Sequence, residues 1–284
     1  MKSGFAFIDK PSDMTSHDVV NQVRRSVGTK KVGHAGTLDP FATGLLILGV
    51  NKATRLLAFL LGLDKSYIAT MRLGEVTDTD DLTGTVVSKT SAFDLDEVTI
   101  LKAVTAHIGT QMQMPSTYSA KKVDGVRAYE KARRGEDVSL TPKQITISNI
   151  SNVRIQKMHD GIDVEFEVSC SSGTYIRALA RDVGQELLVG GHLRALRRVS
   201  IGAFSIAEAT SIESISIRSM QEICQKVMPV HQIDSQSMSN VRYGKPLELN
   251  VAAGVNALIY DDEVVAVIEK QDDMIFYRAV LADV

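Results

Sequence analysis

One stretch of the chain combines turn-forming residues with a single carboxylate. It reads GHAGTLDPFATG at positions 33–44 and lies between two apolar segments. Its three glycines permit backbone conformations that other residues avoid, and Pro40 favours an extended conformation at Asp39. We therefore predict that Asp39 is a positioned acid. An ordinary Asx-turn, which is common before proline, is the alternative.

Two other kinds of side chain could act with such an acid. Arg177 stands in the first turn of a predicted helix, where a cation opposes the helix dipole unless an anion lies nearby. Tyr67 and Tyr175 lie near the starts of a predicted strand and of that helix. A carboxylate can act as a nucleophile at a sugar carbon or as a base, and a nearby arginine keeps it ionised. These residue types suit glycosidic-bond chemistry.

The sequence carries no signature of the common cofactor or metal sites. It has no GxGxxG after a predicted strand, no Walker A sequence and no HExxH, and its six histidines are scattered. We therefore expect no cofactor and no metal. The acidic run at 77–81 departs from an EF-hand loop, because Leu82 and Thr83 occupy the positions of the third ligand and the glycine. We interpret this run as a solvated acidic turn.

The hydrophobic pattern predicts short elements on both sides of the Asp39 loop. Strands are expected at 5–8, 45–50, 65–73, 144–157 and 162–170, the last two joined by a hairpin turn. Helices are expected at 54–61 and 176–187, and from a cap at Thr15 or Ser16 to Gly28. Another helix is expected from a cap at Asp94 or Asp96 to Gly109, and its apolar face would carry Leu101, Val104 and Ile108. A weaker helical region covers 211–227.

The segment 111–135 is predicted to be irregular and basic. It contains a hairpin-type turn at 121–125 and a short helix at 128–134, and six basic residues against two acidic ones lie between Lys121 and Arg134. Five basic residues against two acidic ones lie between Arg177 and Arg198. Such local basic surface could meet phosphates even though the net charge of the chain is −2. A solvated charged face is the alternative.

The charge and the pattern both change towards the C-terminus. Residues 1–206 carry 26 Lys and Arg against 22 Asp and Glu, whereas residues 207–284 carry 6 against 12. Short strands at 256–268 and 275–281 predict a small β domain at 230–284, after a first domain at 1–229 with a basic arm inserted at about 111–140. No apolar run approaches the length of a membrane span, so we expect a soluble, cytoplasmic protein.

Several motifs occur in the order and spacing of the TruB family, the tRNA pseudouridine-55 synthases. They are GHAGTLDP at 33–40, KSY at 65–67, TDTD at 77–80 and SGTYIR at 172–177, with KP at 10–11, TS at 15–16 and LRR at 196–198 in support. The resemblance covers residues 5–206. The chain departs from the family at Pro115-Ser116, where a second proline is usual, and at Leu187-Leu188, where Leu-Gly is usual.

The resemblance implies a fold and an activity. The fold would be α+β, with a mixed, mainly antiparallel sheet flanked by helices and a small PUA-like β domain at the C-terminus. The activity would be isomerisation of a flipped-out uridine at position 55, in the tRNA T-arm, to pseudouridine. This reaction is redox-neutral, which agrees with the absence of cofactor motifs.

The resemblance also assigns roles to residues. Asp39 aligns with the catalytic aspartate, Tyr67 with the tyrosine that stacks on the target base, and Arg177 with the arginine paired to the aspartate. His34 aligns with the residue that fills the gap left by the flipped base, and Tyr175 and Leu196 align with pocket-lining positions. Further RNA contacts are expected from the basic residues Lys10, Lys122, Arg127 and Arg197.

Two other functions remain open from the sequence. A noncatalytic tRNA-binding protein or chaperone would bind tRNA without changing it, and a nucleoside or base-excising glycosidase would release free uracil. The sequence indicates no membrane attachment and no obligate protein partner. Whether Asp39 attacks C1′, attacks the ring or removes a sugar proton also stays open.

Overall fold

The computed structural model describes residues 2–116, 122–123, 126–127 and 140–283. Its main feature is a nine-stranded sheet with the path β1-β3-β12-β4-β11-β10-β7, to which β2 and β13 add at the sides. The strands are β1 (Gly4–Lys10), β2 (Val32–His34), β3 (Thr43–Val50), β4 (Lys65–Leu73), β7 (Gly109–Gln113), β10 (Lys143–Met158), β11 (Gly161–Cys170), β12 (Gly191–Ile201) and β13 (Phe204–Ser205).

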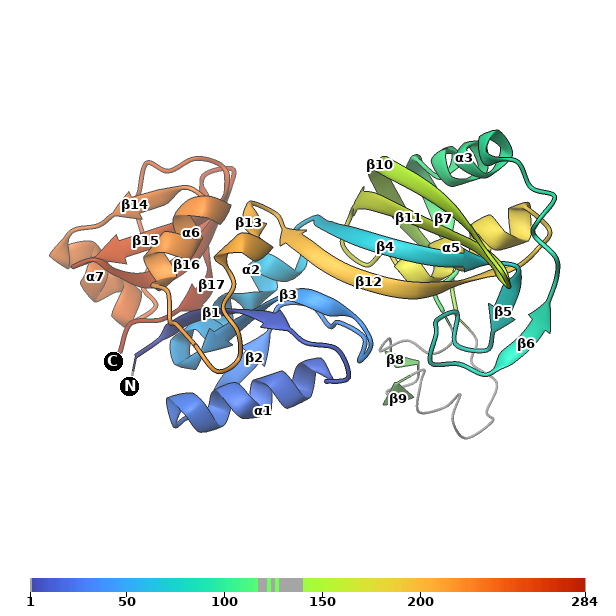
Figure 1. Cartoon of the computed structure of the whole chain (residues 1–284). Helices are drawn as coiled ribbons and strands as arrows, with labels where there is room; N and C mark the ends of the chain where they lie inside the picture. The colour runs from blue at the N-terminus through green and yellow to red at the C-terminus, as the bar shows by residue number, and fades with distance from the viewer. Residues whose placement is uncertain (1, 117–121, 124–125, 128–139, 284) are drawn as a thin grey trace.

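The pairings within this sheet are antiparallel except one, between β12 and β3. That parallel pairing joins Arg197 to Thr43 and Arg198 to Gly44. In Figure 1 the long strands β4 and β12 run from the part built on β1 and β3 to the part built on β10 and β11. The predicted α+β fold with a mixed, mainly antiparallel sheet is confirmed.

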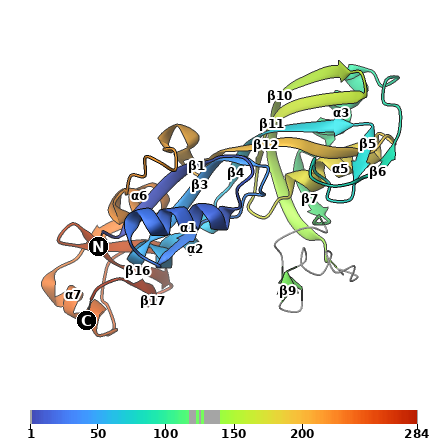
Figure 2. The same cartoon turned by 60° about the horizontal axis from the view of Figure 1, so that its bottom comes forward.

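Alternation along β1 and β3 explains how this part of the sheet is covered on both faces. Phe5 and Phe7 belong to one apolar cluster, whereas Ala6 and Ile8 belong to another because successive side chains of a strand point to opposite faces. Helix α1 (Ser16–Val27) covers the second face, as Figure 2 shows, and buries three valines there, Val19, Val20 and Val23. Thr15 caps this helix with Asp18 in a capping box, and Gly28 ends it at φ +69°.

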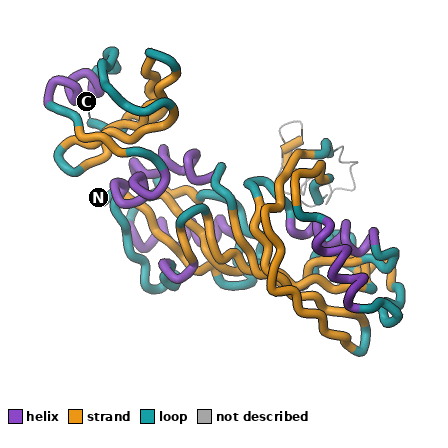
Figure 3. The backbone as a smooth tube through the Cα atoms, turned by 90° about the horizontal axis from the view of Figure 1, so that it is seen from above, coloured by secondary structure: helices purple, strands orange, loops and turns teal. Residues whose placement is uncertain are grey.

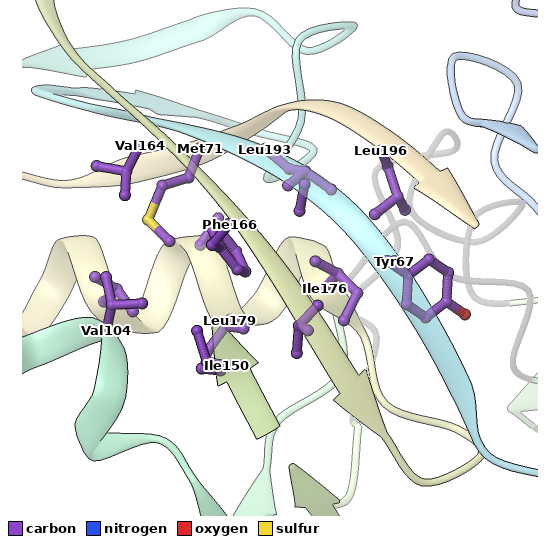
Figure 4. Close-up of a cluster of buried hydrophobic side chains, with 14 of the residues drawn as sticks. Tyr67, Met71, Val104, Ile150, Val164, Phe166, Ile176, Leu179, Leu193 and Leu196 are labelled. Atoms are coloured by element: carbon purple, nitrogen blue, oxygen red, sulfur yellow. The ribbon is translucent and has the colours of Figure 1, made fainter. Parts of the chain in front are cut away.

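The far part of the sheet is covered by α5 (Ile176–Glu186) and α3 (Glu97–Ala106). Helix α5 packs against β12 and β4, and its Leu179 and Val183 join the core that contains Met71 and Phe166. Figure 4 shows this core, with Tyr67 and Leu196 at its end. The core therefore supports both the helix that carries Arg177 and the strand that carries Tyr67.

Shorter elements connect these parts. They are the 3₁₀ segment η1 (Asn51–Leu56), α2 (Leu57–Leu61), the paired strands β5 (Glu75–Thr77) and β6 (Val86–Lys89), and the paired strands β8 (Lys122–Val123) and β9 (Val126–Arg127). The pairing of β8 with β9 agrees with the predicted hairpin-type turn. The predicted basic helix at 128–134 lies outside the described residues.

The C-terminal part forms a sheet of its own, with the order β14-β15-β16-β17. Its strands are β14 (Val230–Gln232), β15 (Gly254–Tyr260), β16 (Glu263–Gln271) and β17 (Met274–Val280), and α7 (Ser235–Arg242) lies between the first two in sequence. Figure 3 shows this sheet, the β1/β3 part and the β10/β11 part in a row. The small sheet shares a core with its neighbour, because Ile259 and Val267 cluster with Phe5 and Ile47.

Three sequence predictions are wrong in detail. The apolar face of α3 buries Val104 as predicted, but Ile100 and Ala103 lie beside it, whereas Leu101 is exposed. Each residue turns a helix by about 100°, so Leu101 points away from the face that Ile100 and Ala103 share. Ile108 lies beyond the end of the helix and is exposed. Residues 111–113, expected to be irregular, extend β7 as an edge strand. Only the end of the region 211–227 is helical, as α6 (Met220–Val227), preceded by η2 (Ile206–Glu208).

Candidate active site

The Asp39 loop connects β2 to β3 and is held by backbone contacts. Gly44 has φ +104°, and a Cβ there would stand 2.3 Å from the carbonyl oxygen of Arg198, so only glycine fits beside β12. The buried Ser16 hydroxyl accepts from the amide of Leu38 at 2.9 Å and donates to its carbonyl at 3.1 Å. The first turn of α1 thus fixes the residue next to Asp39.

The Asp39 carboxylate faces the guanidinium of Arg177. Nε of Arg177 lies 3.0 Å from one carboxylate oxygen, and Nη2 lies 3.2 Å from the other. This two-point contact crosses from the β2–β3 loop to the first turn of α5. The carboxylate therefore serves a long-range ion pair, which favours the positioned acid over the Asx-turn alternative.

Arg177 is almost fully buried and holds a second carboxylate as well. Its side chain is 5% exposed, and Nη1 lies 3.2 Å from Asp81 and 3.0 Å from the carbonyl oxygen of Thr79. One buried cation thus stands between two acids, the buried Asp81 and the partly exposed Asp39. Such a group is costly to bury unless it is paired and hydrogen-bonded, which these contacts achieve.

A cavity of about 540 Å³ opens beside this ion pair. Among the residues that line it are five of the predicted site residues, namely Asp39, Tyr67, Tyr175, Arg177 and Leu196. They come from the β2–β3 loop, β4, the start of α5 and β12. In Figure 4 the hydroxyl of Tyr67 points away from the other labelled side chains of the core. Segments that are far apart in sequence therefore meet at one cavity.

Comparison with known proteins decides the family. A model described as the TruB family pseudouridylate synthase N-terminal domain matches residues 24–176, and one described as the tRNA pseudouridylate synthase B C-terminal domain matches residues 177–232. The chain belongs to the TruB family. The family predicted from the sequence motifs is therefore confirmed.

Relatives and solved structures agree with this assignment. A protein of Arthrobacter sp. (strain FB24) named tRNA pseudouridine synthase B is 46% identical over 260 residues, which cover 89% of this chain and 85% of that protein. One of the same name from Cutibacterium acnes is 44% identical over 279 residues, covering 96% and 95%. A solved Cbf5-Nop10-Gar1 complex matches with a TM-score of 0.71 at 23% identity, covering 98% of this chain and 85% of that chain, which shows a shared fold.

Burial and charge set the protonation of the acid in this TruB-family site. Burial raises the pKa of Asp39, the charge of Arg177 lowers it, and the nearby Asp81 raises it. A third of the Asp39 side chain is nevertheless exposed towards the cavity. Burial also raises the pKa of Tyr67, against the lowering effect of Arg198, so the phenol is protonated at neutral pH.

The acidic run is not the solvated turn that we predicted. The side chains of Asp80 and Asp81 are only 13% and 5% exposed, because Asp80 pairs with Arg181 at 3.2 Å and Asp81 pairs with Arg177. Arg181 lies one helical turn after Arg177 on α5. Arginines four residues apart lie on the same face of a helix. The sequence could therefore have indicated that Arg177 and Arg181 need acidic partners on one side of α5.

Lys10 is a wrong prediction as an RNA contact. Its side chain is fully buried, and Nζ donates to the carbonyl oxygens of Pro11 at 2.8 Å, Met14 at 2.6 Å and Pro40 at 3.0 Å. Burial lowers its pKa to about 8. This lysine therefore fastens the Asp39 loop to β1 and presents no charge to a phosphate.

Arg198 is a structural residue that sequence reasoning grouped with the phosphate contacts. It is 1% exposed and donates to the carbonyl oxygens of Leu45 at 2.7 Å, Gly36 at 3.1 Å and Thr37 at 3.4 Å. It thereby ties the Asp39 loop to β12. Arg198 lies two residues after the buried Leu196 in β12, a spacing that puts both side chains on one face of a strand.

Of the remaining predicted RNA contacts, His34 and Arg197 do not line the cavity, and the side chains of Lys122 and Arg127 lie outside the described residues. His34 ends β2 and is not among the residues that line the cavity. Arg197 is 40% exposed and forms a two-point ion pair with Asp9, at 2.7 and 3.0 Å. The backbones of Lys122 and Arg127 pair in β8 and β9, and their side chains lie outside the described residues.

One wall of the cavity is basic. It carries the exposed Lys143 together with Lys65 and the buried Arg198. Burial and these two neighbouring cations lower the pKa of Lys65 to about 8, and its Nζ donates to two backbone carbonyl oxygens. An anionic group of a ligand would lower the repulsion among these cations. Sequence reasoning missed Lys143, which enters the site from the start of β10.

Proposed function

We propose that this chain converts uridine 55 of the tRNA T-arm to pseudouridine, with Asp39 as the nucleophile or base. The observation that carries the proposal is the Asp39 carboxylate, held by the buried Arg177 on the wall of a cavity that Tyr67 also lines. Family membership and the names of the relatives support the reaction and the tRNA substrate. We also propose a cytoplasmic location, which a tRNA substrate supports.

The reaction rearranges the nucleoside without redox change. The N1–C1′ bond of uridine breaks, the base turns, and a C5–C1′ bond forms; the proton on C5 leaves and N1 gains one. An ionised carboxylate can assist the first step at the sugar or the ring, and Arg177 favours the ionised form. No electron acceptor is required.

The size of the cavity fits a single extruded nucleotide. About 540 Å³ lies within the range of small-molecule sites and is too small for paired RNA. Extruding a base costs a few kcal/mol, and stacking it on an aromatic ring such as Tyr67 returns about 1–3 kcal/mol. The exposed Lys143 on the basic wall offers charge for the phosphates of that nucleotide.

We also propose the division into a catalytic domain at 1–229 and a PUA-like domain at 230–284. The separate C-terminal sheet supports it. This sheet shares a hydrophobic core with β1 and β3. The shared core favours a fixed orientation of the second domain on the first over a flexible linkage.

The experiment uses a T-arm transcript with uridines tritiated at C5. The wild-type protein should release tritium and form one pseudouridine, and Asp39→Asn should bind the transcript and release none. A transcript with cytidine at position 55 should also release none. Release by Asp39→Asn would remove this carboxylate from the mechanism. Binding without release by the wild type would favour a chaperone, and free uracil would favour a glycosidase.

A further inference from the structure

The end of the edge strand β7 and the residues after it, 113–116, lie against the first turns of α5. Gln113, the last residue of β7, is 4% exposed. Its side-chain oxygen accepts from the backbone amide of Tyr175 at 2.9 Å, and its Nε2 donates to the carbonyl oxygen of Tyr175 at 3.1 Å. Tyr175 is the N-cap residue of α5 and makes no side-chain cap of its own. Gln113 thus fixes the backbone two residues before Arg177.

A second contact reaches the guanidinium itself. Ser116 is fully buried, and its hydroxyl lies 3.4 Å from Nη1 of Arg177 and 3.3 Å from the carbonyl oxygen of Thr79. The hydroxyl accepts from the arginine and donates to the carbonyl. Arg177 and Ser116 therefore share Thr79 as a common acceptor. The serine stands where the resembled family usually has proline, which has no side-chain hydroxyl.

A third contact holds Met114, which lies between Gln113 and Ser116 in the sequence. Nη2 of Arg181 donates to the carbonyl oxygen of Met114 at 2.9 Å, while Nη1 pairs with Asp80. The segment 113–116 is thus attached at three points to one face of α5, and each point lies on or beside an arginine of the site. These contacts hold the end of β7 and the residues after it beside Arg177 and Arg181.

We propose that Gln113 and Ser116 are positioning residues that hold Arg177 against the Asp39 carboxylate. The proposal rests on the proposed function. Neither side chain lines the cavity, so neither is expected to touch RNA. They act through the arginine: Gln113 sets where α5 begins, and Ser116 sets the orientation of the guanidinium plane.

The charged and titratable groups around Asp39 give this role a specific readout. They come from four places: Arg177 on α5, Asp81 before β6, Lys10 on β1 and Tyr67 on β4. Arg177 lowers the pKa of Asp39, whereas burial and Asp81 raise it. If the arginine moves away, the pKa of Asp39 rises. The rate, which requires the ionised acid, then falls on the acid side of the pH profile and recovers at higher pH.

The experiment measures single-turnover tritium release from pH 5 to pH 9 for the wild type, Ser116→Ala and Gln113→Met. We expect the acid limb of both variants to shift to higher pH. For Ser116→Ala the loss of rate at low pH should be about tenfold, close to the effect of one hydrogen bond to a charged group. Affinity for tRNA should stay within about twofold of wild type, because no lost group faces the RNA.

The control is Ser219→Ala, which removes the N-cap of α6 far from the cavity. It should lower the melting temperature and leave the acid limb in place. An unmoved limb in Ser116→Ala overturns the proposal, whatever the rate, since a merely structural role changes stability alone. Ser116→Ala decides alone if Gln113→Met does not fold. Absence of release by the wild type would instead refute the proposed function.

Discussion

Replacing Arg177 by methionine tests the electrostatics of the site most directly. Methionine keeps much of the length of the side chain but leaves Asp39 and Asp81 without the cation that lies 3.0 and 3.2 Å from them. Removing one partner of a buried ion pair costs about 3–5 kcal/mol. Because Asp39 is one-third exposed, solvent screens its share, and we expect a loss of about 3 kcal/mol, or a melting temperature lower by roughly 6–12 °C.

The loss should depend on pH in a defined direction. Burial already raises the pKa of Asp39, and without Arg177 it rises further. A carboxyl group whose pKa is higher in the folded than in the unfolded protein destabilises the fold when it ionises. This destabilisation begins near the unfolded pKa, about 4, and grows until the pH reaches the folded pKa. The stability difference between variant and wild type should therefore be small near pH 4 and should increase as pH rises through the folded pKa of Asp39.

Urea unfolding followed by circular dichroism at pH 5 and pH 8 measures both quantities. The matched control is Arg154→Met, which breaks an ion pair with Glu165 that is 79% and 45% exposed and should cost less than about 1 kcal/mol at either pH. A cost for Arg177→Met as small as this control, or one that does not change with pH, would refute the electrostatic reasoning.

Substitutions at Tyr67, Arg198 and Gly184 test three further features, namely base stacking, the attachment of the Asp39 loop and the packing of α5 on β12. Tyr67→Phe keeps the ring and should reduce the rate without weakening tRNA binding. Tyr67→Ala should reduce the rate and also weaken tRNA binding by about 1–3 kcal/mol. Equal tRNA affinities for the two variants would contradict stacking. Arg198→Met leaves three backbone carbonyl oxygens without their donor and should lower the unfolding free energy by about 3 kcal/mol or more in urea titrations; a neutral result would show that water replaces the guanidinium. Gly184→Ala places a Cβ 2.2 Å from the amide nitrogen of Gly191 and should destabilise by about 1–3 kcal/mol, whereas Gly62→Ala meets no atom within 4 Å and should be neutral within about 0.5 kcal/mol.

Local signals explain which elements could be predicted from the sequence. The capping residue Thr15 and the terminator Gly28 bound α1 as expected, and the alternation at 65–73 matches β4. Glycines and a proline around Asp39 indicated a shaped loop, because their backbone preferences act over a few residues. The resemblance to the family motifs supplied the other candidate site residues, Tyr67 and Arg177 among them.

Contacts between distant segments explain what could not be predicted. Asp81 was assigned to solvent because its arginine partner lies almost one hundred positions later in the chain. Lys10 was assigned to RNA because its type is usually exposed, and only the folded loop supplies the three carbonyl oxygens that it binds. Gln113 and Ser116 carry no local pattern, since their partners are set by how β7 and α5 meet.

The parallel pairing of β3 with β12 has a consequence for folding during synthesis on the ribosome. Strand β3 ends at Val50 and its neighbour β12 begins only at Gly191. At about 5–20 residues per second on the ribosome, the edge of β3 at Thr43 and Gly44, which β2 does not cover, lacks its partner for roughly 7–30 s. An unpaired strand edge invites association with other chains, so the nascent polypeptide passes through an aggregation-sensitive interval before any catalytic centre exists.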